Sequence, residues 1–295
     1  MGAVTGSGRV RRAVVLAASL PLLLGPSAAD PAAADPPGAV PHELHCAGPP
    51  AGCVDEAAGV LRRLRDGLGC DHRAPFAAVC TRLEESLGAA VRAGAFAEPA
   101  WAGGSLNTGF VNRYLAAYHA DRAGRPVPAA WRAAFDAARA GDLNGGQDVL
   151  LAANAHIQRD MPYVLAELGP SRAREPDYAR VQAVLDRAYQ PAVEDVARRY
   201  APLLALGDAR WNPVARPTAG GLFHLWRETA WAHARRLAAA GSPAERRRAE
   251  AAIESNAARW AVLLGVPGVP GYRAVRDAYC RAGGGGSGGS AAGGR

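Results

Sequence analysis

The feature that most constrains this chain is the spacing of its apolar residues between positions 54 and 281. They recur every three or four residues, which is the repeat of an amphipathic helix, and no β-branched run alternates with polar residues over the length of a strand. Glycine and proline interrupt the repeat and mark helix ends. The pattern therefore predicts an all-α fold, a single multi-helix, bundle-like domain over residues 53–282. The predicted helices span residues 54–67, 75–93, 105–122, 128–140, 147–168, 176–200, 221–240, 243–264 and 272–281.

The N-terminal residues have the three-part pattern of a secretory signal peptide. A basic head with three arginines at positions 9–12 precedes an apolar run over residues 13–24, and small residues follow. The apolar run is too short to cross a membrane. We therefore expect a signal peptide over residues 1–29, with cleavage as late as residue 34 as a variant, and a secreted, extracellular protein without a transmembrane segment. A buried N-terminal helix is the alternative.

Both flanks of the helical region have compositions that disfavour packing. Residues 30–52 are rich in proline and alanine, and they are predicted to form an exposed, disordered spacer. Residues 283–295 contain almost only glycine, serine and alanine. Such a segment buries too little apolar surface to become ordered, so we expect a disordered Gly/Ser C-terminal tail.

The five cysteines favour an oxidising compartment. Cys46, Cys53, Cys70 and Cys80 lie close together, and Cys280 lies near the end of the helical region. In a secreted chain, cysteines of this kind form structural disulfides. The shortest loops pair Cys46 with Cys53 and Cys70 with Cys80, although spacing alone leaves the connectivity open. The odd number leaves at least one thiol free or bonded between chains. A zinc site is the alternative, but no C-x-x-C motif supports it.

The predicted helix 147–168 carries polar residues at the borders of its apolar face. At about 100° per residue, Asn154 and Asp160 lie on opposite edges of that face, and His156 lies one turn before Asp160. Pro162 has no backbone N–H to donate, so a kink or a restart of the helix is expected beside Asp160. Polar groups next to a broken helix suit either a functional site or a joint between packed helices.

A second pair with the same His-x-x-x-Asp/Glu spacing, His224 and Glu228, lies in the predicted helix 221–240. Together with His156 and Asp160, this pair could hold metal ions inside a helical bundle, with a spacing similar to that of zinc-dependent phospholipase C-like enzymes. The helical repeat argues against this, because it points His224 and Glu228 away from the apolar face. His156, Asp160 and Glu228 would be the catalytic residues of such an enzyme, with zinc as its cofactor. The simpler expectation is that the protein has no cofactor.

Five stretches of the sequence resemble a known family. They are FVNRY at residues 110–114, GRPVPAAW at 124–131, NAHIQRDMP at 154–162, DYARV at 177–181 and RETAW at 227–231. They resemble an uncharacterised actinobacterial secreted family with a domain of unknown function, and the N-A-H-I-x-x-D-[LM]-P motif is the most specific part of the resemblance. It covers about residues 66–235 and implies a helical fold, but no established activity. The residues that it singles out are Asn112, Asn154, His156, Asp160, Arg227 and Trp231.

Each of these residues also has a structural interpretation. Asp160 and Arg227 suit a partly buried ion pair that joins two helices. Asn112 and Asn154 suit hydrogen bonds to the backbone at helix crossings, and Trp231 suits an anchor of the core. In a binding protein, by contrast, Asn112, Asn154, Arg227 and Trp231 would contact the ligand.

Charge and missing motifs exclude several functions. All 34 basic residues are arginines and the formal net charge is +7, but the tryptophans fall on apolar stripes, so no specific nucleic-acid binding is expected. No G-x-S-x-G or H-E-x-x-H motif indicates a serine hydrolase or a zinc protease.

Three functions remain, and the sequence alone does not decide whether the protein is an enzyme. The leading hypothesis is an extracellular domain that binds an unknown small molecule or a component of the cell envelope. The alternative is an extracellular, metal-assisted hydrolase that uses His156 and Asp160, with Glu228 or His119 nearby. The third is a structural envelope protein.

Overall fold

A computed structural model describes residue 2 and residues 39–201, 215–265 and 271–284. For residues 215–220 it describes the backbone alone. Apart from residue 2, the predicted signal peptide lies outside the described residues. The first part of the predicted spacer, residues 30–38, and the tail beyond residue 284 lie outside them too.

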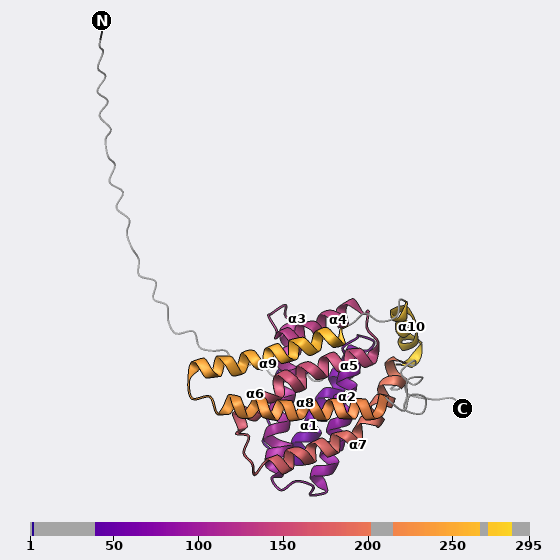
Figure 1. Cartoon of the computed structure of the whole chain (residues 1–295). Coiled ribbons are helices and arrows are strands. Elements are labelled where there is room, and N and C mark those ends of the chain that lie inside the picture. The colour runs from indigo at the N-terminus through magenta and orange to yellow at the C-terminus, as the bar shows by residue number, and fades with distance from the viewer. Residues whose placement is uncertain (1, 3–38, 202–214, 266–270, 285–295) are drawn as a thin grey trace, which may run out of the picture. The chain divides into compact units, whose positions relative to one another are not determined.

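The described part of the chain is helical and contains no β-strand, which confirms the all-α prediction (Figure 1). Most predicted helices end within a few residues of the observed ones, because their apolar repeats and terminating glycines are local signals. The helices Ala215–Ala238 and Pro243–Leu264 run side by side as a hairpin (Figure 1). The α-helices are α1 (Pro50–Leu68), α2 (Ala74–Arg92), α3 (Asn107–Arg122), α4 (Ala129–Ala140), α5 (Gly145–Asn154), α6 (Met161–Leu168), α7 (Glu175–Tyr200), α8 (Ala215–Ala238), α9 (Pro243–Leu264) and α10 (Tyr272–Tyr279).

Wider π-helical turns interrupt this pattern. η1 (Ala100–Leu106) precedes α3, and η2 (Ala155–Asp160) separates α5 from α6. Because Pro162 has no N–H, the regular bond to the carbonyl of Gln158 cannot form, and the backbone widens just before the proline. The break that the sequence predicts in helix 147–168 is therefore confirmed. Its polar side chains are nevertheless buried: His156, Gln158 and Asp160.

Aromatic side chains organise the apolar core. Phe76 of α2, Tyr114 of α3 and Trp131 of α4 contact one another, and the Tyr114 and Trp131 rings stack with centroids 5.3 Å apart. Tyr178 of α7 and Trp231 of α8 stack with centroids 4.8 Å apart. Burial of each such side chain contributes about 1.5–3 kcal/mol to stability. These clusters fix α2, α3, α4, α7 and α8 around the interior of the domain.

The segment before α1 packs against α3. Asn112 accepts a hydrogen bond from the backbone N–H of Leu44 at 2.7 Å and donates one to the Leu44 carbonyl at 3.1 Å. The Leu44 side chain is buried, and α1 already begins at Pro50. The described residues 39–52 are therefore not an exposed spacer throughout: Leu44 is buried and residues 50–52 belong to α1, whereas His42, Glu43 and His45 are exposed. A proline- and alanine-rich composition does not show that a side-chain amide can satisfy the backbone of an extended segment.

The disulfides agree with the sequence in one pair and differ in the other. Cys46 is bonded to Cys53, as the short loop predicts. Cys70 is bonded to Cys280, so the predicted pairing of Cys70 with Cys80 is wrong. α2 places Cys80 on its buried face, where it is a free thiol. The correct partner was hidden because it lies 210 residues away in the sequence.

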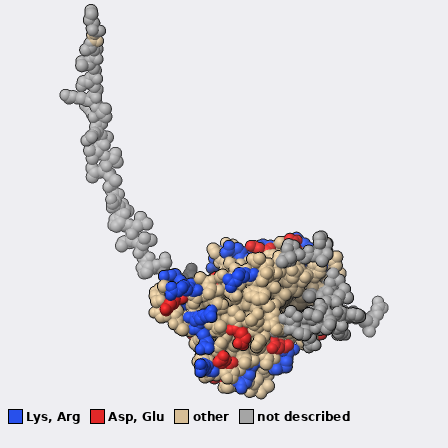
Figure 2. All heavy atoms as spheres, viewed as in Figure 1, with Lys and Arg blue, Asp and Glu red and all other residues tan. Residues whose placement is uncertain are grey.

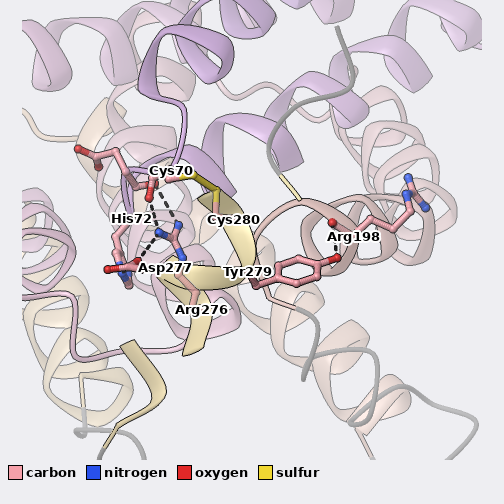
Figure 3. Close-up of a disulfide and its surroundings, with 8 residues drawn as sticks. Cys70, His72, Arg198, Arg276, Asp277, Tyr279 and Cys280 are labelled. Carbon is pink, nitrogen blue, oxygen red and sulfur yellow. Dashed lines mark hydrogen bonds and ion pairs between the residues drawn. A yellow bond between two sulfur atoms is a disulfide. The ribbon is translucent and has the colours of Figure 1, made fainter. Parts of the chain in front are cut away.

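The Cys70–Cys280 disulfide ties the C-terminal helix to the start of α2 (Figure 3). Arg276 of α10 is fully buried beside it and donates hydrogen bonds to the carbonyls of Cys70 and Asp71. On the neighbouring turn, the Tyr279 hydroxyl donates to the carbonyl of Arg198 at 2.7 Å. The C-terminal helix is thus joined to both α2 and α7.

The face of the molecule shown in Figure 2 carries charges of both signs. On the face shown in Figure 2, arginines and acidic side chains alternate with uncharged residues, and no large basic patch forms there. Within the described residues, no helix combines the length and the apolar character that a membrane span requires.

Candidate functional site

A cavity of about 550 Å³ lies between α2, α3, α5, η2, α7 and α8. Its volume is typical of small-molecule sites, which measure roughly 300–1,000 Å³. Most of its wall is apolar or aromatic, with side chains such as Val79, Leu106 and Phe110. Polar and ionisable side chains interrupt this wall, among them Cys80, Glu84, Asn107, His156, Asp186 and Arg227.

Glu84 of α2 is an acid within this apolar wall. Its residue is 8% exposed, and its Oε2 has no hydrogen-bond partner among the described residues. Burial raises the pKa of Glu84 to about 8, and the neighbouring Asn107 amide opposes the rise only in part. The carboxyl is therefore mostly protonated at neutral pH and can donate a hydrogen bond. Apart from this interaction with Glu84, the Asn107 Nδ2 makes no hydrogen bond among the described residues, so the two groups together can bind a ligand oxygen.

His156 of η2 lies between this cavity and the core. Its ring stacks on Phe110 with centroids 3.4 Å apart, and its Nδ1 lies 3.5 Å from Asp160 Oδ2. Burial lowers the pKa of His156, and the interaction with Asp160 opposes the shift only in part. The imidazole is therefore neutral at pH 7, which suits a hydrogen-bonding wall residue better than a cation.

Asp160 is held by groups other than the predicted one. It is 1% exposed, and its carboxylate accepts hydrogen bonds from Trp131 Nε1 at 2.8 Å and from Arg159 at 3.0 Å. Arg159 also pairs with Glu254 at 2.9 Å. The predicted ion pair between Asp160 and Arg227 is therefore wrong. Asp160 is a buried structural acid that joins η2 to α4, because Trp131 of α4 donates to it from the core.

Arg227 of α8 instead faces α7 and the cavity. Its side chain is 8% exposed, and its nearest carboxylate is Asp186, whose Oδ1 lies 3.7 Å from Nη1. That distance exceeds a hydrogen bond, and Nη1 has no other partner in the described part of the chain. Burial lowers the pKa of Arg227, against the opposing effects of Tyr178 and Asp186. The guanidinium remains charged at neutral pH, because arginine is far more basic than any other side chain.

The four candidate metal ligands do not form a common site. His156 and Asp160 are buried, whereas His224 and Glu228 are exposed on α8, as their positions in the helical repeat indicate. Across the residues that the structure covers, no three His, Cys, Asp or Glu side chains converge in a way that could hold a metal ion. The pairwise spacing was similar to that of a metal enzyme, but the two helices present their pairs to different environments.

The remaining predicted binding residues contact protein rather than the cavity. Asn154 is fully buried, and its Nδ2 donates to the Ala257 carbonyl of α9 at 2.9 Å. Asn112 binds the backbone of Leu44, and Trp231 packs in the core. Of the residues proposed from the sequence as site residues, only His156 and Arg227 line the cavity.

Glu84 and Asn107 were not singled out in the sequence, although one signal marks Glu84. The apolar stripe of α2 contains Phe76, Cys80 and Leu87, and Glu84 occupies the helical position between the last two. An acid within an apolar stripe is either buried or disrupts the packing of its helix. No comparable signal marks Asn107, which is the first residue of α3 and directly follows the π-helical turn of η1.

Substitution of Asp160 tests this description of the core. Asp160→Asn should cost only about 1 kcal/mol, because the amide oxygen still accepts from Trp131 and Arg159 keeps its pairing with Glu254. Asp160→Ala leaves the buried indole N–H without an acceptor, so it should cost about 1–3 kcal/mol more. Urea unfolding of the two variants measures the difference. Equal losses would contradict the role of the Trp131 hydrogen bond.

Comparison of this chain with known proteins identifies its family. Neither the curated proteins nor the solved structures contain a detectable match to this chain. Residues 54–267 match a family described as a family of unknown function, DUF5995. The match spans most of the helical domain, including every cavity-lining residue named above. The chain therefore belongs to the family of unknown function DUF5995.

Proposed function

We propose that this protein is an extracellular binding protein for a small, largely apolar molecule. The observation that supports this most directly is the cavity of about 550 Å³. Protein interiors are normally packed without voids of this size, and an unfilled cavity destabilises a fold in proportion to its volume. An apolar chamber with a few unpaired polar groups is the usual form of a ligand site.

The extracellular part of the proposal has separate support. The signal-peptide pattern over residues 1–29 predicts export, and the Cys46–Cys53 and Cys70–Cys280 disulfides suit an oxidising compartment. The ligand would then be a free small molecule or a component of the cell envelope. The motif at residues 154–162 resembles that of an actinobacterial secreted family, and we include an actinobacterial origin in this proposal.

Binding without chemistry has more support than metal-assisted hydrolysis. A hydrolase built on His156 and Asp160 would need a nucleophile or a metal-bound water beside them. The Asp160 carboxylate instead accepts hydrogen bonds from Trp131 and Arg159, and His224 and Glu228 are exposed on α8. The hydrolase remains a prediction of the sequence for which the cavity offers no additional support.

A neutral fluorescent probe tests the binding function. N-phenyl-1-naphthylamine should bind the oxidised, full chain with a rise in emission, because the cavity removes the probe from water. Ala153→Phe, which places a ring in the cavity wall, should weaken binding by about tenfold or more, equal to 1.4 kcal/mol. Ala116→Phe, on the exposed side of α3, is the matched control and should leave binding unchanged.

Cys80 gives a second readout from the same cavity. It is the free thiol of the chain and lines the cavity wall, and burial raises its pKa, with a further contribution from Glu84. Alkylation by an apolar maleimide should therefore be slow, and saturating probe should slow it further. If the probe fails to bind, or if it binds without protecting Cys80, the cavity is not a ligand site.

A further inference from the structure

The cavity contains a buried cation that its own neighbours satisfy only in part. Arg227 Nη1 makes no hydrogen bond among the described residues, and the Asp186 carboxylate lies 3.7 Å away. The Asp186 side chain is 47% exposed and already accepts a hydrogen bond from Gln182 at 2.7 Å. A solvent-exposed acid held elsewhere compensates a buried charge poorly. Arg227 therefore has both charge and donor capacity available to a bound molecule.

The remaining wall requires an apolar ligand body. Side chains such as Leu83, Leu87 and Met161 from α2 and α6 surround the rest of the space. A small inorganic anion would leave this apolar surface unfilled, and a hydrocarbon alone would leave the guanidinium unpaired. A molecule with both parts satisfies both requirements.

We infer that the cavity binds an amphipathic molecule with a long apolar chain and an anionic headgroup, and that Arg227 binds this headgroup. The inference rests on the proposed binding function and adds the class of ligand to it. Carboxylates and phosphates share the required chemistry, because both present two oxygens to the planar fork of a guanidinium.

The other ionisable groups of the wall do not oppose an anion at neutral pH. Burial raises the pKa of Glu84 to about 8, so this carboxyl is mostly uncharged, and burial also keeps the Cys80 thiol protonated. The imidazole of His156 is neutral for the same reason. Asp186 is the remaining acid of the wall, and its exposed side chain is screened by water.

Competition against N-phenyl-1-naphthylamine tests the headgroup. Hexadecanoate, hexadecyl phosphate and hexadecanol share one chain and differ in the headgroup. On the oxidised wild-type chain at pH 7, at least one of the two anions should displace the probe at a concentration roughly ten- to a hundredfold below that of the alcohol, the range expected for a charge-assisted hydrogen bond. The preferred anion identifies the headgroup as a carboxylate or a phosphate.

Variants of α8 assign this preference to Arg227. Arg227→Met should reduce the preference for the anion to about twofold or less while the affinity for hexadecanol stays the same, and Arg227→Lys should restore part of it. Arg235→Met, on the exposed face of the same helix, should keep the wild-type preference.

The possible failures are distinguishable. If the wild type binds the probe but does not prefer an anion to the alcohol, the inference is wrong and the binding function stands. The same conclusion follows if Arg227→Met binds the probe and keeps the preference. If the wild type does not bind the probe, both the inference and the proposed function are wrong. The wild-type comparison needs no variant, so it remains decisive if Arg227→Met does not fold.

Discussion

Glu84→Gln is expected to stabilise the protein, and by an amount that grows with pH. The unfolded carboxyl ionises near its usual pKa of 4.5, whereas burial raises the pKa of the folded one to about 8. Between these values the folded state holds more protons than the unfolded state, so wild-type stability falls as pH rises and levels off above pH 8. The full difference corresponds to roughly 3–5 kcal/mol. Glutamine has the same shape without the ionisation, so the variant should lack this loss.

Urea unfolding of the wild type and Glu84→Gln at pH 5, 6.5 and 8 measures the effect. Glu85→Gln is the matched control, since Glu85 is the next residue but lies near the surface. Although burial raises the pKa of Glu85, hydrogen bonds from Arg62 and Arg82 hold it below its usual value. Its stabilising effect is present above its unfolded pKa and is lost in acid, the opposite direction. Equal pH profiles for wild type and Glu84→Gln would show that the cavity does not perturb Glu84.

Replacement of both Cys70 and Cys280 by serine is expected to cost about 3–5 kcal/mol, because this disulfide closes a long loop and restricts the unfolded chain strongly. The Cys46–Cys53 disulfide closes only a short loop, with a separation of 7 residues. Replacement of both cysteines by serine should therefore cost less, about 2–3 kcal/mol. Guanidinium unfolding of the two double variants compares these losses.

Peptide mapping without reductant checks the same disulfides directly. The peptides that contain Cys70 and Cys280 should be joined, and Cys80 should be the residue that reacts with a thiol reagent after denaturation. A linkage between Cys70 and Cys80 would contradict the fold at the start of α2. A larger loss from the short-loop variant would contradict the loop-length argument.

The helices were predictable because each depends on neighbours a few residues away. The predicted helix at 243–264 agrees with α9 residue for residue, and its proline and the glycine after it are local signals. The kink beside Asp160 was also predictable, since the missing N–H of Pro162 acts within one turn.

Contacts between distant helices were not predictable in the same way. The helical repeat placed Asp160 at the edge of a buried face, but it could not show that Trp131 of α4, and not Arg227 of α8, would reach it. The cavity was invisible for the same reason, because its wall combines residues from several helices. Glu84 could have been recognised as an acid in an apolar stripe, but only the packing shows that it faces an unfilled space.

The long-range disulfide also sets an order of events during synthesis. Cys70 leaves the ribosome some 210 residues before Cys280, so its final partner does not yet exist while α1 and α2 can already form. In that interval Cys80 is the nearest thiol that could trap Cys70 in a wrong bond. In the folded domain Cys80 is buried on the inner face of α2, which removes this competitor. The bond between Cys70 and Cys280 can form only once the helix that carries Cys280 has reached the start of α2, so the same bond that stabilises the fold also reports the docking of this helix.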